Sequence, residues 1–486
     1  MNILDILIIF GYLAAMLAIG MYANKKQKNL EDYYVASKSI GASTVMCLWV
    51  SYWVGGATML GTVQQTYDFG ISGGTYPIIV ALGLLIFGVT FAGMLNKLGT
   101  RLKYITLPDL IRDRYDERSG IVSAITMIVI YVAYTAAQLV ACASIIHVLS
   151  GWSLGLCYIV STAVVVIYTS IGGFLAVTYT DWVQLGILIV GIFVIALPVA
   201  MSRAGGLAAI NTTVPPEFFS LRNSSISGIV AMFISTVLCF YTNMDSFTRC
   251  FAAKSPRDAR NGTIWAAVLV FIIGLLTMLL GFCAKVVLPG LEDSSNALGL
   301  LVFDMFPGGM RALVLMGVLS AAMSSGDICI LTASANLTND IYKKYLNKDA
   351  SDKHLVRVGI LASLFVGGLS ALLAWFIPNV IDVLFIGINV ASATLFFPII
   401  GGLFWKKANK TAAFWSTLVT LVVVCLWSIA NKVGAGGIFA LDSVYPGLLC
   451  SGILFFSISI LKPADKTEQK RIDSFLSMIK TDAEEK

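Results

Sequence analysis

The chain has 486 residues, of which 58% are hydrophobic and only 12% are charged, whereas soluble domains carry roughly 25% charged residues. This balance excludes an ordinary soluble enzyme and indicates an integral membrane protein. The nine cysteines form no CxxC pair and lie in or beside apolar segments, so neither a disulfide framework nor a zinc site is predicted.

Apolar runs recur from one end of the chain to the other, and roughly 20 residues of helix cross about 30 Å of hydrocarbon. We predict an all-α fold in which residues 1–462 form a single polytopic domain of about thirteen transmembrane helices. A charged cytoplasmic tail, expected to be solvated, follows over residues 463–486. The predicted spans are 3–23, 42–68, 74–96, 119–149, 153–173, 180–201, 226–248, 263–289, 309–337, 355–376, 380–404, 412–433 and 444–462.

The distribution of Lys and Arg orients these helices, because cytoplasmic connections are enriched in basic residues. With the N-terminus outside, 28 of the 33 basic residues fall in the cytoplasmic connections and the tail. We therefore predict a multi-pass protein of the cell membrane with a cytoplasmic C-terminus. The net charge of +6 reflects this topology and is no argument for nucleic acid. The partners predicted for such a membrane protein are the lipid bilayer and a small-molecule substrate, and no nucleic acid. The cytoplasmic connections are 24–41, 96–118, 174–179, 249–262, 338–357 and 405–411.

Two spans contain interruptions at membrane depth. The second has Gly55 and Gly56 within "WVSYWVGGATMLGT", and the seventh has Asn243 and Asp245 within "LCFYTNMDSFTRCF". Each alone has an ordinary explanation, namely close helix packing at the glycines and a helix end near the inner loop. Together they begin two successive sets of five helices, 2–6 and 7–11, which are inverted because five is odd. Broken helices at matching positions of inverted repeats indicate a transporter binding site at the bilayer midplane.

Polar groups also lie deep in later spans. Asp181 opens the sixth span and Asp327 lies in the ninth, and a charge within the membrane indicates function. In "AAMSSGDICILTASA" the carbonyl of Ala321 and the hydroxyls of Ser324 and Ser325 share one helical face. Oxygen ligands of this kind suit an alkali cation, and further carbonyls are expected where the second span unwinds before Gly55. The alternative is that these serines only bond their own backbone four residues back.

At these residues the chain resembles the sodium/solute symporter family, which includes proline, pantothenate, sialic acid, sugar and choline carriers. The similarity lies in "GGFLAVTYTDWVQ", "TRCFAAKSPRDAR" and "SAAMSSGDICILTASANLTNDIY". The resemblance implies thirteen helices, an inverted-repeat core like that of the leucine transporter, and an outside N-terminus. It also implies a principal sodium site made by the carbonyls of Ser51, Val54 and Ala321 and the hydroxyls of Ser324 and Ser325.

The resemblance implies a second sodium site in some members, with an aspartate matching Asp181 and hydroxyls matching positions 327 and 328. This chain departs there, with Asp327, as in the choline branch, and Ile328. "WVGG" matches the choline branch, including an aromatic residue at Trp53, but Asn243 stands where that branch has tryptophan and is closer to the sugar branch.

We therefore expect a non-enzymatic carrier that brings a small organic solute into the cell with sodium ions by alternating access, working as a monomer. The solute, an amino acid such as proline, a carboxylate, a sugar or a quaternary amine, is expected to bind between the two interruptions. The predicted contacts are Trp53, Gly55, Thr58 and Asn243. Three alternatives stay open, namely a proton-coupled symporter of the same fold, a non-transporting solute sensor, and an intramembrane aspartyl protease using Asp181 and Asp327, although "SSGD" lacks the GxGD pattern of such proteases.

Overall fold

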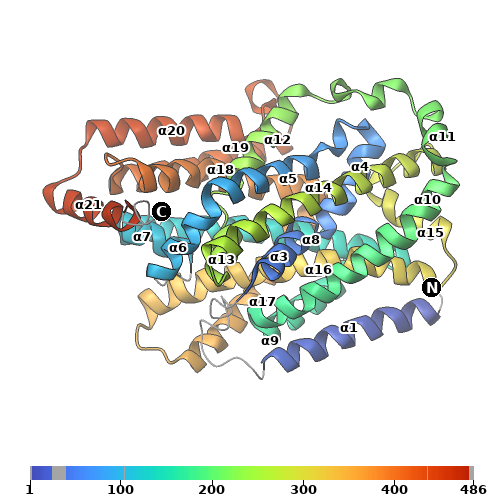
Figure 1. Ribbon diagram of the computed structural model, residues 1–486, viewed down its shortest axis with the longest axis horizontal. Coiled ribbons are helices and arrows are strands. Elements are labelled where there is room, and N and C mark those ends of the chain that lie inside the picture. Colours follow the sequence, from blue (N-terminus) through green and yellow to red (C-terminus); the bar gives the residue numbers. More distant parts are fainter. Residues whose placement is uncertain are drawn as a thin grey trace.

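The computed structural model describes residues 3–24, 40–102, 104, 106–377, 379–434 and 436–480, and within these residues the fold is entirely helical (Figure 1). The predicted all-α class is therefore confirmed. The helices are α1 (Ile3–Asn24), α3 (Ala42–Trp53), α4 (Gly56–Phe69), α5 (Tyr76–Phe87), α6 (Gly93–Leu102), α7 (Leu107–Arg114), α8 (Glu117–Ser150), α9 (Leu154–Leu188), α10 (Leu197–Arg203), α11 (Gly206–Thr213), α12 (Ile226–Cys239), α13 (Met244–Ala252), α14 (Pro256–Val287), α15 (Ala297–Met305), α16 (Met310–Ala335), α17 (Asp352–Phe376), α18 (Val380–Phe404), α19 (Lys410–Lys432), α20 (Val444–Leu461) and α21 (Lys466–Lys480).

Ten helices within the described residues are long and apolar enough to cross a membrane, and α3 with α4 adds one bent pair. Shorter apolar helices at Leu7–Ile19 and Leu154–Ile167 lie within the first and fifth predicted spans. Every predicted span thus falls on an apolar helix, while the count of thirteen stays a prediction. The predicted connection 174–179 has helical backbone within α9, and most of the connection 24–41 lies outside the described residues.

The break in the second span lies where the sequence predicts it. Helix α3 ends at Trp53, α4 begins at Gly56, and the two axes differ by 53°. In the seventh span, α12 ends at Cys239 and α13 begins at Met244 after a turn. Both interruptions are thus present as breaks in helical backbone.

Small residues at the first break allow α4 to lie against α16. A Cβ atom on Gly56 would stand 2.3 Å from the Cβ of Ala322, and one on Gly55 would stand 2.2 Å from Oγ of Ser325. Both distances are far below any real contact, so only glycine permits this approach. The packing explanation for the two glycines is therefore correct, and this packing also positions the break beside the serines of α16.

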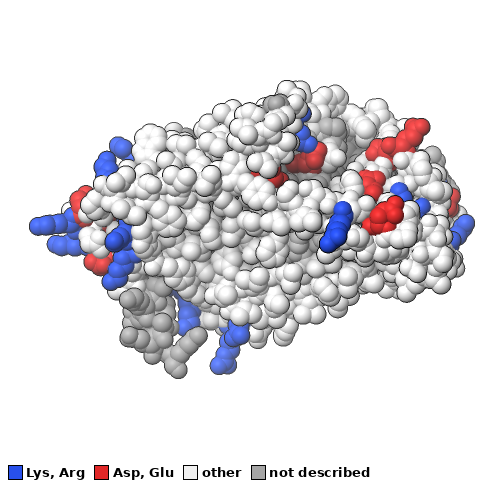
Figure 2. Space-filling view, turned by 90° about the horizontal axis from the view of Figure 1, so that it is seen from above, with Lys and Arg blue, Asp and Glu red and all other residues white. Residues whose placement is uncertain are grey.

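On the face drawn in Figure 2, many charged side chains lie toward the two ends of the long axis, and most of the surface between them is uncharged. Large apolar side chains on the flanks, such as Phe365, Trp375 and Phe376, are more than half exposed. In water such exposure would be costly, but lipid tails cover it. This pattern is that of a membrane-embedded protein.

The tail differs from the expectation of a solvated segment. Residues Lys466–Lys480 form α21, and its side chains of Ile472, Phe475 and Leu476 are buried. Arg471 donates from Nε to the carbonyl of Asp113, 2.9 Å away, so the helix is attached to α7. The high charge of the tail hid its apolar stripe, which has the i, i+3, i+4 spacing of an amphipathic helix.

We expect Gly56→Ala to lower the free energy of unfolding by about 1–3 kcal/mol, the usual cost of overpacking, because the added methyl group meets Ala322. Thermal unfolding of the purified protein measures the change. Gly368→Ala in α17 is the matched control, since nothing lies within 4 Å of its added Cβ. Equal melting temperatures for both variants would contradict this account of the α4–α16 contact.

Candidate functional site

The serine hydroxyls of α16 face the carbonyls at the end of α3. Oγ of Ser324 lies 3.1 Å from the carbonyl oxygens of both Ser51 and Ala321. Oγ of Ser325 lies 3.0, 2.8 and 3.2 Å from the carbonyl oxygens of Ser51, Tyr52 and Ala321. The serines therefore contact their own helix, as the alternative interpretation expected, and they also reach across to the broken helix.

This cluster holds more oxygen lone pairs than protons. Each hydroxyl carries one proton, so at most two of the five close oxygen–oxygen contacts contain a hydrogen atom between them. The other contacts place electron-rich oxygens about 3 Å apart in a buried place. A hard cation coordinated by these oxygens would remove that repulsion.

The structure thus brings together four of the five residues that the sequence assigns to the principal ion site: Ser51, Ala321, Ser324 and Ser325. The fifth, Val54, is buried at the break itself, with φ −97° and ψ 41°. Its amide still bonds the carbonyl of Val50 at 2.8 Å. The carbonyl of Tyr52 is an additional oxygen of the cluster that the sequence analysis missed.

Asp181 and Asp327 are both fully buried near this cluster. The hydroxyl of Ser51 donates to the backbone carbonyl of Asp181 at 3.4 Å, which places Asp181 against α3. Neither carboxylate oxygen of Asp181 has a hydrogen-bond partner among the described residues. Asp327 accepts a 2.5 Å bond from the hydroxyl of Thr169, and the two aspartates are close enough to interact electrostatically.

A buried carboxylate without a partner is costly, and in practice it holds a proton or a cation. Asp181 is such a group, because its carboxylate has no hydrogen-bond partner among the described residues and the guanidinium of Arg249, which interacts with it electrostatically, is already paired with Asp245. The donor set is again oxygen only, which suits an alkali ion better than a transition metal.

The two helix breaks meet through their aromatic residues. The ring centroids of Trp53 and Phe240 are 4.6 Å apart. This contact joins the break between α3 and α4 to the turn before α13. Asn243 caps this turn and donates from Nδ2 to the hydroxyl of Tyr134 at 3.2 Å. The indole Nε1 of Trp53 and the amide Oδ1 of Asn243 are buried without a hydrogen-bond partner among the described residues, so each has one unused polar group.

The other two predicted solute contacts lie differently. Gly55 faces Ser325 and Gln138, so it belongs to the contact with α16. Thr58 is buried one turn further along α4, and its hydroxyl faces that of Tyr76. The predicted solute residues thus line the break on two sides.

A cavity of about 300 Å³ lies beyond Thr58, further along α4. Gly61 and Thr62 of α4 line it, and so do Tyr76 and residues of α18. None of the four predicted solute contacts lines this cavity, which we call the α4–α18 cavity. Its lining residues are Gly61, Thr62, Gln65, Phe69, Ser72, Gly73, Tyr76, Ser224, Ser225, Gly228, Ile229, Met232, Ile381, Asp382, Phe385 and Asp442.

Helix α13 contains a buried ion pair, and its arginine also binds α3. Arg249 contacts the carboxylate of Asp245 at 3.2 Å and donates to the carbonyl of Leu48 at 3.1 Å. Its guanidinium lies between the rings of Trp49 and Tyr52, 5.0 and 4.7 Å from their centroids. Asp245 also accepts a 2.7 Å bond from the hydroxyl of Tyr131 in α8, so its carboxylate is already bound in this arrangement.

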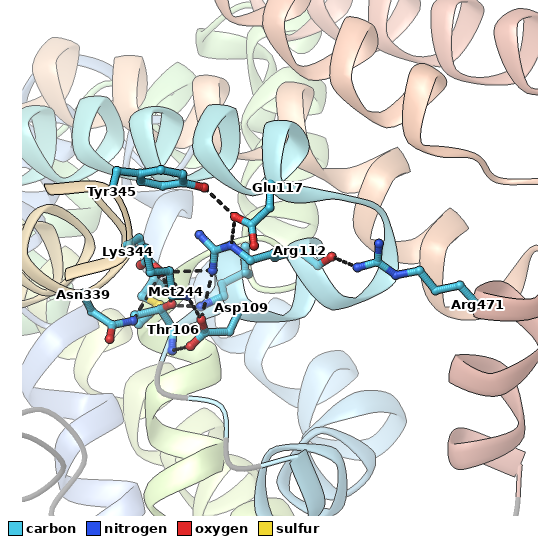
Figure 3. Close-up of polar contacts among 11 residues, drawn as sticks. Thr106, Asp109, Arg112, Glu117, Met244, Asn339, Lys344, Tyr345 and Arg471 are labelled. Atoms are coloured by element: carbon cyan, nitrogen blue, oxygen red, sulfur yellow. Dashed lines mark hydrogen bonds and ion pairs between the residues drawn. The ribbon is translucent and has the colours of Figure 1, made fainter. Parts of the chain in front are cut away.

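Charged side chains around α7, which lies near the left end of Figure 1 while α4 lies toward the right, form a network (Figure 3). Arg112 of α7 contacts Asp109 at 3.1 Å, Glu117 at 2.9 Å and Asp340 at 3.6 Å. Lys344 contacts the carboxylates of Asp109 and Asp340 as well. The network ties α7 and the start of α8 to the π-helical extension of α16 (Asn336–Leu346), so this end is closed by polar contacts.

Sequence reasoning missed three polar side chains beside the predicted ion site. Gln138 of α8 accepts the amide of Ala57 at 3.1 Å, Thr169 binds Asp327, and Gln184 donates to the hydroxyl of Tyr12 at 3.1 Å. Gln138 is a lone polar residue in an apolar run, whereas Thr169 precedes Ser170 and Gln184 follows Asp181 by three positions. These residues were visible in the sequence, but only the structure shows which of them face the breaks.

A family model described as the sodium:solute symporter family matches residues 33–420. The osmoregulated proline transporter OpuE of Bacillus subtilis is 27% identical to this chain over 487 residues, which cover 94% of this chain and 95% of OpuE. The sodium/pantothenate symporter of Escherichia coli is 24% identical, with coverages of 93% and 95%. The high-affinity choline transporter 1 of Caenorhabditis elegans is 25% identical, with coverages of 87% and 77%.

The fold is shared with a Na+-coupled sialic acid symporter solved in a substrate-bound outward-open state. The TM-score is 0.80 at 21% identity, and the match covers 96% of this chain and 99% of that one. The Mhp1 transporter of the nucleobase-cation-symport-1 family has a TM-score of 0.51 at 14% identity, with coverages of 91% and 98%. The fold of a sodium-coupled transporter is thus confirmed.

We expect Arg112→Gln to raise amide hydrogen exchange at least tenfold in residues 107–114, because removing one partner of a buried ion pair costs about 3–5 kcal/mol. Local opening of that size is measurable by exchange mass spectrometry. Arg118→Gln is the control, since Arg118 is exposed and lies outside the network. Unchanged exchange in Arg112→Gln would show that the network does not close this end.

Proposed function

This chain belongs to the sodium:solute symporter family, and we propose that it carries a small organic solute into the cell together with sodium ions by alternating access. The observation that supports the proposal most strongly is the proton-poor oxygen cluster at the first break. There the hydroxyl oxygens of Ser324 and Ser325 each lie 3.0–3.2 Å from the carbonyl oxygens of both Ser51 in α3 and Ala321 in α16.

In this proposal sodium links the two helices that alternate. The ion is held by the carbonyls of Ser51, Val54 and Ala321 and the hydroxyls of Ser324 and Ser325. Because the site includes both α3 and α16, it is complete only when these helices are packed together. Sodium binding therefore favours the packed arrangement, since a ligand stabilises the state that it binds better.

The solute is placed beside the ion, between Trp53 and Thr58 on one side and Asn243 on the other, with Gly55 providing the close approach. Asn243 supplies an acceptor that no described residue uses, and Trp53 supplies a donor. The network around Arg112 closes the cytoplasmic end in this form, while the α4–α18 cavity leads in from outside. A second arrangement, in which the network opens, releases the solute.

We also propose a second sodium ion at Asp181 and Asp327. The carboxylate of Asp181 has no hydrogen-bond partner among the described residues. Two carboxylates near one another favour a cation between them. One sodium ion crossing about 100 mV releases roughly 2.3 kcal/mol, and a tenfold gradient adds roughly 1.4 kcal/mol. Two ions double this driving force.

Sodium chloride should raise the melting temperature of the purified protein relative to potassium chloride at equal ionic strength. Sodium at 100 times its Kd would raise the free energy of unfolding by about 2.7 kcal/mol. The double variant Ser324→Ala with Ser325→Ala should lose this difference.

Two controls sharpen the test of this site. Ser363→Ala should keep the sodium response, because that buried serine bonds only its own helix at Gly359. Asn243→Ala should keep it too and yet weaken sodium-driven uptake in proteoliposomes. A sodium response that survives in the double serine variant would contradict the site assignment.

Asp327→Asn should lower the Hill coefficient for sodium from about two toward one and reduce the charge moved per solute. The reason is that the second ion loses the carboxylate that it shares with Asp181. Solute-induced currents in proteoliposomes report both quantities. A Hill coefficient near one in wild type and variant alike, with equal charge moved per solute, would contradict the second sodium ion. Asp181 would then only line the path of the solute.

A further inference from the structure

The α4–α18 cavity carries an unbalanced negative charge. Two carboxylates line it, those of Asp382 and Asp442. Lys432 is paired with Asp382, and both side chains are about 40% exposed. Asp442 contacts no cationic side chain within the described residues, so the cavity keeps one negative charge.

Asp442 is held in place by neutral donors. Its Oδ1 accepts bonds from Nδ2 of Asn389 at 2.8 Å and from the amide of Val444 at 3.0 Å. Burial raises the pKa of this carboxyl group above its usual value. A carboxylate that is partly buried, oriented by its neighbours and without a counter-ion is suited to receive a cation.

The walls around this charge are aromatic and polar. Tyr76 and Phe385 line the cavity with their rings 5.4 Å apart in an edge-to-face arrangement. Thr62, which is 1% exposed, also lines the cavity, and its buried hydroxyl has no hydrogen-bond partner among the described residues. Aromatic faces beside a carboxylate attract organic ammonium groups, and a lone hydroxyl offers a hydrogen bond to the rest of the solute.

The chemistry further inside agrees with this charge preference. The four proposed solute contacts include no Lys or Arg. The guanidinium of Arg249 is already bound by Asp245 and two aromatic rings. A purely anionic solute would pass an acidic cavity and then meet no uncommitted cationic side chain among the described contacts, only the proposed sodium ions, whereas a solute with a cationic nitrogen is attracted at the entrance.

We propose that the α4–α18 cavity is an entry site for a cationic nitrogen, and that the transported solute is an organic amine or a zwitterion and not a carboxylate anion or a sugar. This rests on the proposed symport function and narrows its solute class. The ammonium group lies between the carboxylate of Asp442 and the faces of Tyr76 and Phe385. Thr58, which faces Tyr76, connects this entry site to the proposed central site.

Choline and 3,3-dimethyl-1-butanol are matched probes, because they have nearly the same shape and differ by one positive charge. Saturation-transfer NMR on the purified protein in sodium-free potassium buffer would give the Kd of each from its methyl signal. We expect choline to bind at least tenfold more tightly than the neutral alcohol. Asp442→Asn, which keeps the acceptor for Asn389 and Val444, should weaken choline about tenfold, the order expected for one charge at several Å in a partly hydrated cavity.

Asp304→Asn is the matched control, since it removes the same charge from an exposed position on α15 and should leave choline binding unchanged. Equal affinities for choline and the neutral alcohol, or equal effects of the two aspartate variants, would overturn the proposal. So would displacement of choline by sodium chloride but not by potassium chloride, because the cavity would then be an inorganic cation site.

The double variant Ser324→Ala with Ser325→Ala separates this proposal from the symport function. It should retain choline binding in the cavity and lose the thermal stabilisation by sodium. If wild type shows sodium-driven uptake but no preference for the cationic probe, only the entry site is wrong. If the cationic preference holds and no solute is taken up with sodium, only the symport function is wrong.

Discussion

The arrangement of this molecule depends on how the backbone carbonyls at a broken membrane helix are satisfied. Lipid supplies no donors, so an interrupted helix is tolerated only where protein or a bound ion covers the freed groups. Here α16 covers them with Ser324 and Ser325, and Gly55 and Gly56 permit the approach. The two hydroxyl protons cannot satisfy all five oxygen–oxygen contacts, and this deficit connects the backbone geometry to the proposed ion site.

The first break is also in contact with the second interruption and with α13. Trp53 contacts Phe240 at the second interruption, and Arg249 fastens the following helix to α3. Movement of α3 relative to α16 would therefore shift the proposed solute contacts and α13 together. The acidic α4–α18 cavity and the polar network around Arg112 (Figure 3) differ in kind, and the alternating access proposed above requires such a difference.

Local chemistry explains what the sequence could predict. The break at Gly55 and Gly56 was predictable because two adjacent glycines at membrane depth weaken a helix. The serines that face the break were predictable because they share one side of a regular helix. The breaks, the apolar helices and the all-α class follow from such local signals. The roles of individual ion and solute ligands still rest on proposals.

The remainder depends on contacts between distant segments, which no local pattern encodes. Arg112 meets Asp340 only because α7 and the end of α16 lie together, and Asp442 lines a cavity with Thr62 from far earlier in the chain. The burial of Phe475 was hidden for a different reason. Its helix is highly charged, and the charges mask a stripe of three apolar side chains.

The docking of α21 has a consequence for biosynthesis. The ribosome makes α21 after every helix that it contacts, yet Arg471 binds the backbone carbonyls of Arg112 and Asp113 in the much earlier α7. The end of the molecule around α7 thus reaches its final form only after all the membrane helices have been synthesised. At about 5–20 residues per second, synthesis of the roughly 360 residues from α7 to Arg471 takes about 20–70 seconds, so a newly made α7 lacks this attachment for that time.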